Sequence, residues 1–229
     1  GSGRTLGIVG PPGSGKSTIA RLIPRFYDPT AGRILIDGQD IAQVSIASLR
    51  RTIGGVQQDS FLFTASVDHN VAYGDPSTDM DQIVQASTDA QIHSFIEELP
   101  RNYQTLVGED GVSLSGGQRQ RVSIARGTLT DAPIFIFDDA TAAIDAGTEQ
   151  RIRRALKARA GTHTTIIISH RLVSIMHADE ILFLDEGCIV ERGTHEQLLA
   201  LKGRYFELHS LQLRDEHRSP RLTERVKPA

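Results

Sequence analysis

The stretch GPPGSGKST, residues 10–18, lies near the start of the chain, between the apolar run TLGIV and the helix-like run IARLIPRF. Its spacing of Gly, four residues and Gly-Lys-Ser is the phosphate-loop pattern. The alternative is a chance match in an ordinary surface turn, but a position between a strand and a helix is the context that the motif requires. The stretch therefore predicts a strand, a phosphate-binding loop and a helix, in this order.

The residue types of the loop suit a phosphate. Its glycines permit close approach of the backbone, so that successive N–H groups can point at an anion. Lys16 can reach the outer phosphates, and the hydroxyl of Ser17 can ligate a magnesium ion bound to them. The positive end of the helix dipole faces the same anion. The candidate nucleotide-binding residues are Gly10, Pro11, Pro12, Gly13, Ser14, Gly15, Lys16, Ser17 and Thr18.

Apolar runs elsewhere predict the rest of an α/β fold. The strand-like runs are TLGIV, RILIDG, TIGGVQ, IFIFDD, TTIIIS and EILFLD. They alternate with helical segments, and several are continuously apolar, as expected of parallel strands buried on both faces. Turn signals in DPTAGRILIDGQDI, residues 28–41, add an antiparallel hairpin.

The strand signal disappears between residues 67 and 129, where polar-rich helical patterns such as MDQIVQASTDAQIHSFIEEL replace it. We interpret residues 67–129 as an inserted helical subdomain, and residues 1–66 and 130–213 as the core. Residues 214–229 are highly charged and contain two prolines. They predict a mobile tail or the remnant of a linker.

Composition narrows the functional classes. The 229 residues are 39% hydrophobic, enough for one large domain or a domain with a subdomain. The net charge of −3 provides no electrostatic footprint for nucleic acid, and no apolar run approaches the ~18 residues of a membrane span. We expect a domain that is soluble by itself, a natural chain that continues upstream of Gly1, and a buried, apolar role for the single cysteine, Cys188.

Two further stretches carry chemistry. PIFIFDDAT ends an apolar strand with Asp138 and Asp139, and carboxylates at this edge of a parallel sheet face the ligand crevice. Asp138 fits a role in holding magnesium, and Asp139 would lie beside the attacking water; the alternative is a pair of helix-capping aspartates. LSGGQRQR, residues 114–121, places a hydroxyl and bare N–H groups at the start of another helix. The chain thus holds a second anion-binding terminus.

The three motifs follow one another along the chain as the phosphate loop, LSGGQRQR and PIFIFDDAT. With them in this order, the sequence resembles the ATP-binding cassette (ABC) family, specifically the nucleotide-binding domain of exporter-type transporters, from Gly3 to about Leu213. The resemblance implies a P-loop NTPase (RecA-like) fold, with a mostly parallel sheet core, an antiparallel β portion and an inserted α-helical subdomain. It implies an ATPase that uses ATP and Mg²⁺ at the cytoplasmic face of the cell membrane. The implied partners are a second nucleotide-binding domain, paired head to tail, and a transmembrane domain fused upstream.

The resemblance also implies roles for individual residues. Gln58 in GVQQDSFLF resembles the Q-loop glutamine, Asp145 in ATAAID the D-loop aspartate, and His170 in IIISHRL the switch histidine that contacts the γ-phosphate. TLVGEDG, residues 105–111, resembles the exporter loop that faces the transmembrane partner. The implied site comprises catalytic Lys16, Gln58, Asp139 and His170, the metal ligands Ser17, Gln58 and Asp138, and nucleotide contacts from Ser115, Gly116, Gly117, Gln118 and Asp145.

The sequence departs from the family pattern at two points. Asp139 stands where the family usually has glutamate, and its side chain is shorter by one methylene. This implies slow hydrolysis at the chain's own site, as in the degenerate half of heterodimeric exporters, unless a backbone shift lets Asp139 act as an ordinary base. Residues 1–9 contain no aromatic side chain, so the residue that stacks on adenine is expected upstream of this sequence.

Three rival functions remain at this stage. A soluble, non-transport ABC ATPase of the DNA-repair or translation type would want a basic face or a long coiled-coil insertion, and the sequence has neither. An importer ATPase is a second rival, although LFTASVDHNV, VGEDG and SHRL resemble exporters more. The third is a nucleotide-gated dimerisation module with little turnover. The transported substrate and the choice between homodimer and heterodimer are left open.

Overall fold

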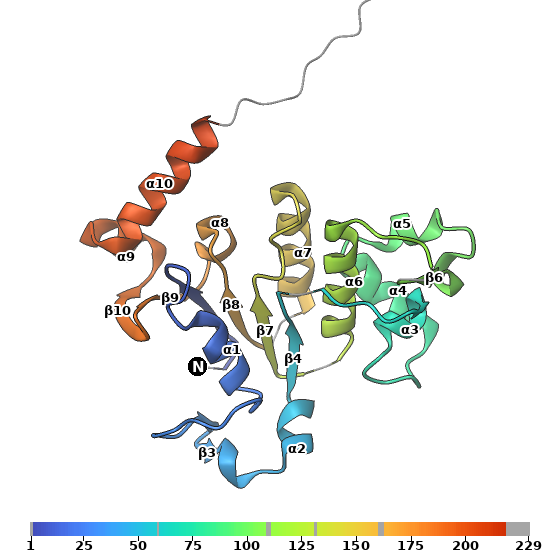
Figure 1. Cartoon of the computed structure of the whole chain (residues 1–229), viewed down its shortest axis with the longest axis horizontal. Coiled ribbons are helices and arrows are strands. Elements are labelled where there is room, and N and C mark those ends of the chain that lie inside the picture. Colours follow the sequence, from blue (N-terminus) through green and yellow to red (C-terminus); the bar gives the residue numbers. More distant parts are fainter. Residues whose placement is uncertain (1, 59, 109–110, 131, 160–162, 219–229) are drawn as a thin grey trace, which may run out of the picture.

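A six-stranded sheet lies at the centre of the computed structural model, which describes residues 2–58, 60–108, 111–130, 132–159 and 163–218 (Figure 1). Its strand order is β10-β9-β1-β8-β7-β4. All neighbouring pairs from β9 to β4 are parallel, and β10 pairs antiparallel with β9. The strands are β1 (Thr5–Val9), β4 (Ile53–Val56), β7 (Ile134–Asp138), β8 (Thr164–Ile168), β9 (Glu180–Asp185) and β10 (Cys188–Gly193).

Helices and two small antiparallel sheets of two strands each surround this sheet. The short strands are β2 (Leu35–Ile36) with β3 (Gln39–Asp40), and β5 (Ala65–Ser66) with β6 (Leu106–Val107). The helices are α1 (Lys16–Leu22), α2 (Ile46–Arg51), α3 (Val67–Val71), α4 (Met80–Asp89), α5 (His93–Glu97), α6 (Gly116–Leu129), α7 (Ala146–Arg159), α8 (Leu172–Ile175), α9 (His195–Leu201) and α10 (Arg204–Arg218), with 3-10 turns η1 (Ile41–Gln43) and η2 (Asn102–Gln104).

The first strand is buried on both faces, as its apolar run predicts. Ile8 packs with Ala20 of α1 in one cluster, whereas Val9 packs with Ile175 of α8 and Tyr205 of α10 in another. Successive residues of a strand point to opposite faces, so β1 lies between two layers of helices. The mostly parallel α/β architecture is therefore confirmed, and the loop that follows β1 emerges at the carboxyl edge of the sheet.

Helices α3 to α6 gather on one side of the sheet and share a core that includes Val71, Ala86 and Val122 (Figure 1). Two details of the expected helical region differ. The run at residues 80–99 is broken at Gln91, whose φ of 57° is left-handed, so α4 and α5 are separate helices. Strands are not absent either, because β6 pairs with β5. The outer bounds of this subdomain, 67 and 129, stay a prediction.

One expectation near the carboxyl end is wrong. Cys188 is exposed, because it begins β10, which is the edge strand of the sheet, directly after the turn at Gly187. Helix α10 extends to Arg218 and so includes the first residues of the expected tail, and Tyr205 and Leu208 pack its first turns onto the core. The bounds of the tail, 214 and 229, stay a prediction. Residues 219–229 lie outside the described residues. No described helix combines the length and the apolar character that crossing a membrane would require.

The contact between α6 and β4 leaves no room for a side chain at Gly127. A Cβ there would lie 2.8 Å from Val56 Cγ2 and 2.9 Å from the backbone oxygen of Gly55. We expect Gly127→Ala to lower the free energy of unfolding by about 1–3 kcal/mol, because overpacking outweighs the better helix propensity of alanine. Urea denaturation measures this change.

Gly147→Ala in α7 is the matched control. A Cβ at Gly147 would meet only the flexible side chains of Asp145, at 3.3 Å, and Arg151, at 3.8 Å. This variant should be neutral or more stable by up to about 1 kcal/mol. Equal destabilisation of both variants would contradict the tight α6–β4 contact.

Candidate functional site

The loop between β1 and α1 is held against the turn that joins β9 to β10. A Cβ at Gly10 would lie 2.0 Å from the backbone oxygen of Leu184, so only glycine fits there. The N–H of Gly187 donates to the oxygen of Ser14 at 3.2 Å. Gly15, the N-cap of α1, has a left-handed φ of 98°. These contacts fix a curved backbone at the N-terminus of α1, where N–H groups can receive an anion.

Lys16 folds back over this loop. Its Nζ donates to the oxygens of Gly10, at 2.9 Å, and Pro11, at 2.8 Å. Burial lowers the pKa of Lys16, while the carboxylates of Asp139 and Asp138 oppose this effect. The ammonium thus lies against the carbonyls of the loop. Phosphate oxygens bound there could replace the two carbonyls as its hydrogen-bond acceptors, and their negative charge would favour the charged form of Lys16.

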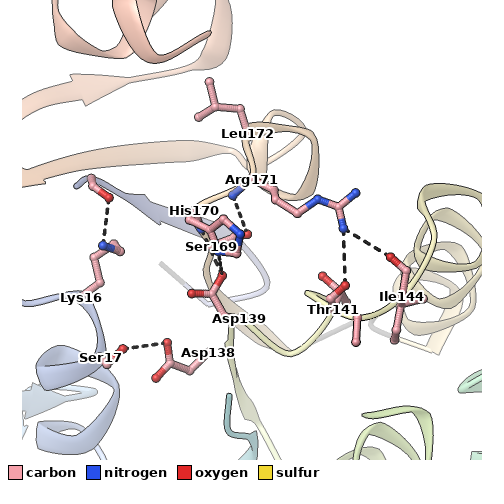
Figure 2. A network of polar contacts seen from close by, with 12 residues as sticks. Lys16, Ser17, Asp138, Asp139, Thr141, Ile144, Ser169, His170, Arg171 and Leu172 are labelled. Carbon is pink, nitrogen blue, oxygen red and sulfur yellow. Dashed lines mark hydrogen bonds and ion pairs between the residues drawn. The ribbon is translucent and has the colours of Figure 1, made fainter. Parts of the chain in front are cut away.

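Ser17 and Asp138 bring two oxygen donors together. The hydroxyl of Ser17 donates to Asp138 Oδ1 at 3.2 Å (Figure 2), and burial raises the pKa of Asp138 although this bond opposes the shift. Gln58 is exposed and lines, with Arg21 and Asp138, a hollow of about 240 Å³. Hydroxyl, carboxylate and amide oxygens are ligands that magnesium accepts, and a cation would relieve the cost of the buried carboxylate. The residues therefore fit a magnesium ion.

Asp139 and His170 contact each other at the ends of β7 and β8. Asp139 Oδ1 accepts from the backbone N–H of His170 at 3.1 Å and lies 2.8 Å from its Nδ1 (Figure 2). Asp139 adopts a left-handed φ of 45°, which aspartate tolerates better than most residues. The Asp139 side chain is 12% exposed and that of His170 is 59% exposed. The two candidate catalytic residues thus form one unit, with the imidazole reaching toward solvent.

Arg171 links this unit to the segment that carries Asp145. Its guanidinium donates to the oxygens of Ile144, at 3.3 Å, and Thr141, at 3.5 Å (Figure 2). It also lies 3.4 Å from the Glu149 carboxylate. Asp145 itself accepts a backbone hydrogen bond at the start of α7. Sequence reasoning missed Arg171, and its position directly after His170 is the only signal that could have suggested it.

The second candidate anion-binding terminus lies at the start of α6. Ser115 is exposed and forms a capping box with Gln118: Gln118 N–H donates to Ser115 Oγ at 3.3 Å, and Ser115 N–H donates to Gln118 Oε1 at 2.8 Å. A Cβ at Gly117 would lie 2.8 Å from the oxygen of Ala143. Among the described residues, no hydrogen bond or ion pair joins residues 115–118 to the phosphate loop. The two candidate phosphate-binding elements are therefore not joined by any polar contact within the described part of this chain.

Comparison with known proteins gives consistent matches. A family model described as ABC transporter matches residues 1–142. The ATP-dependent lipid A-core flippase of Syntrophus aciditrophicus is 48% identical over 215 residues, which are 94% of this chain and 36% of that protein. An uncharacterized ABC transporter ATP-binding protein of Bacillus subtilis is 47% identical over 214 residues, 93% of this chain and 37% of that protein. The chain therefore spans little more than a third of these relatives.

A solved structure of a bacterial Atm1-family ABC exporter with ATP bound matches with a TM-score of 0.89 and 49% sequence identity. The match covers 92% of this chain and 37% of that one. The expected P-loop fold is thereby confirmed.

Replacement of Lys16 tests the phosphate loop. We expect Lys16→Ala to raise the Kd for ATP, with magnesium present, by about a hundredfold or more, because charged hydrogen bonds contribute about 1.5–3 kcal/mol each. Isothermal titration calorimetry measures the affinity. Arg51→Ala, which removes one positive charge from an exposed position of α2, is the control and should bind ATP normally. Unchanged affinity in Lys16→Ala would refute the assignment of the loop.

Proposed function

This chain belongs to the ABC transporter family, and we propose that it is the ATP-binding and ATP-hydrolysing domain of an exporter. The proposal rests on one observation: a lysine, a serine–aspartate contact and an aspartate–histidine pair lie at the carboxyl ends of three adjacent strands. Lys16 follows β1, the Ser17–Asp138 contact lies at the end of β7, and the Asp139–His170 pair joins β7 to β8. This arrangement suits the transfer of a phosphoryl group to water, which depends chiefly on positioning and electrostatics.

The residues divide the reaction among them. The loop amides and the N-terminus of α1 bind the phosphates, and Lys16 neutralises charge on the outer ones. Ser17, Asp138 and Gln58 would hold a magnesium ion, which would neutralise phosphate charge when bound. Asp139 accepts the proton of the attacking water, and His170 holds the γ-phosphate and the water in line.

Two chains complete each other in this proposal. The exposed N-terminus of α6, with Ser115 and its neighbouring glycines, is free to bind the nucleotide held by the phosphate loop of a second chain. Head-to-tail pairing then creates two shared sites, and ATP holds the pair together. The separation of the two elements within one chain supports this assignment, whether the partner is identical or different.

An aromatic surface supports a membrane partner. Phe61 and Tyr73 are 64% and 57% exposed, and Phe63 lies between them, stacked on Tyr73 at 4.1 Å. Arg126 of α6 donates to the oxygen of Phe61 and covers the rings of Phe63 and Tyr73. Since β6 lies beside this segment and belongs to the loop that resembles the exporter motif, we assign this surface to a transmembrane domain. The domain would then work at the cytoplasmic face of the membrane.

Slow turnover at the chain's own site follows from Asp139. Its carboxylate is one methylene shorter than glutamate, and one of its oxygens is engaged by the N–H and the ring of His170. Displacement of a base by ~1 Å can cost about a hundredfold in rate. The same observation favours, as the second candidate, a dimerisation module that binds ATP with little turnover.

The pairing proposal predicts the effect of Ser115→Arg. The added cation and bulk should block pairing induced by a non-hydrolysable ATP analogue, measured by analytical ultracentrifugation, while ATP binding to one chain changes less than twofold. Ser48→Arg adds the same side chain at an exposed position of α2 and should pair normally. If Ser115→Arg abolishes binding to the single chain, the model of two half-sites is wrong.

Asp139→Glu tests the slow site. In the complete protein that carries this chain, the longer side chain should raise ATP turnover, by up to about a hundredfold, because it restores the reach of the base. Asp139→Asn, which removes the base, should lower turnover. Phosphate release at saturating ATP measures both rates. No rise in Asp139→Glu would mean that geometry elsewhere sets the rate.

A further inference from the structure

The side chain of Gln212, in α10, bridges the backbone on either side of Arg171. Its Nε2 donates to the oxygen of His170 at 2.6 Å, and its Oε1 accepts from the N–H of Leu172 at 2.9 Å. One amide from the carboxyl-terminal helix thus satisfies two backbone groups of the segment that carries the switch histidine. These groups lie 42 and 40 residues away from Gln212 in the sequence.

The backbone at this point needs an external partner. Leu172 is the first residue of α8, and the first N–H groups of a helix have no acceptor within the helix. The N-cap residue, Arg171, forms no side-chain cap, because its guanidinium is directed at Ile144 and Glu149. Gln212 supplies the missing cap from another helix.

The start of α10 is firmly fixed, so the position of Gln212 is set as well. Tyr205 is completely buried, its hydroxyl lies 2.7 Å from His195 Nδ1, and its backbone N–H donates to the Glu191 carboxylate at 3.0 Å. Arg204 forms an ion pair with Asp185 at the end of β9. Gln212 lies seven residues after Tyr205, which is two turns along the same face of the helix.

We propose that Gln212 is a positioning residue for His170. Asp139 contacts the imidazole of His170, and the side chain of Arg171 bonds to the segment before α7. Gln212 of α10 donates to the carbonyl of His170 and so fixes the backbone there. Through this bond, the placement of α10 sets the direction in which the imidazole points. The inference rests on the proposed function, since His170 acts on the γ-phosphate there.

The test compares three variants of the complete protein that carries this chain. Gln212→Ala removes both hydrogen bonds. Gln212→Glu keeps an acceptor for the N–H of Leu172 and loses the donor to the oxygen of His170. Leu211→Ala changes the adjacent, 56% exposed side chain and serves as the matched control.

Hydrogen exchange at the Leu172 amide reports the cap. We expect it to be at least tenfold faster in Gln212→Ala, and close to wild type in Gln212→Glu and Leu211→Ala. Turnover should fall about tenfold in both Gln212 variants with the Kd for ATP changed less than twofold. In a His170→Ala background, Gln212→Ala should add no further loss, because both changes act through one group.

Each result decides a separate point. Unchanged exchange at Leu172 in Gln212→Ala would overturn the bridge. Full turnover in Gln212→Glu, or an additive loss with His170→Ala, would overturn the positioning role and leave only a helix cap. Absence of ATP hydrolysis in the wild-type protein would overturn the proposed function and with it the role in turnover, whereas the exchange rates would still establish or refute the bridge itself.

Discussion

The close approach of Gly10 to the carbonyl of Leu184 is the constraint on which the site depends. It places the end of β1 directly against the end of β9, and the turn after β9 then supports Ser14 through Gly187. With the loop held there, α1 must begin at the edge of the sheet, and Lys16 can fold back over the loop carbonyls. A larger residue at position 10 would separate the two strands and move all of these groups.

The sheet order explains how distant parts of the chain meet. Strands β1, β8 and β7 are neighbours although residues 16, 138 and 170 are far apart in sequence, because the parallel crossovers place all three carboxyl ends at one edge. The short-range contacts then act between strands: Ser17 with Asp138, and Asp139 with His170. The candidate site is thus assembled at the edge of the sheet from several motifs, and no single motif contains it.

Sequence reasoning succeeded where the signal is local. The run TLGIV coincides with β1, and the glycine spacing after it predicted the curved loop that the structure has between β1 and α1. It failed where the outcome depends on tertiary contacts. The exposure of Cys188 follows from the edge position of β10, and β6 exists only because β5 lies beside it. Arg171 and Gln212 have no motif, since their roles depend on the distant segments that they contact.

The separation of the phosphate loop from the residue 115–118 terminus has a consequence for mixtures of defective chains. If each nucleotide is shared between two chains, a chain with a damaged loop still offers an intact helix terminus to its partner. When such a chain pairs with one damaged only at that terminus, one site combines an intact loop with an intact terminus. The other site combines the damaged loop with the damaged terminus. Two genes that each encode an inactive protein would then restore activity when expressed together, because one of the two sites in every mixed pair is intact.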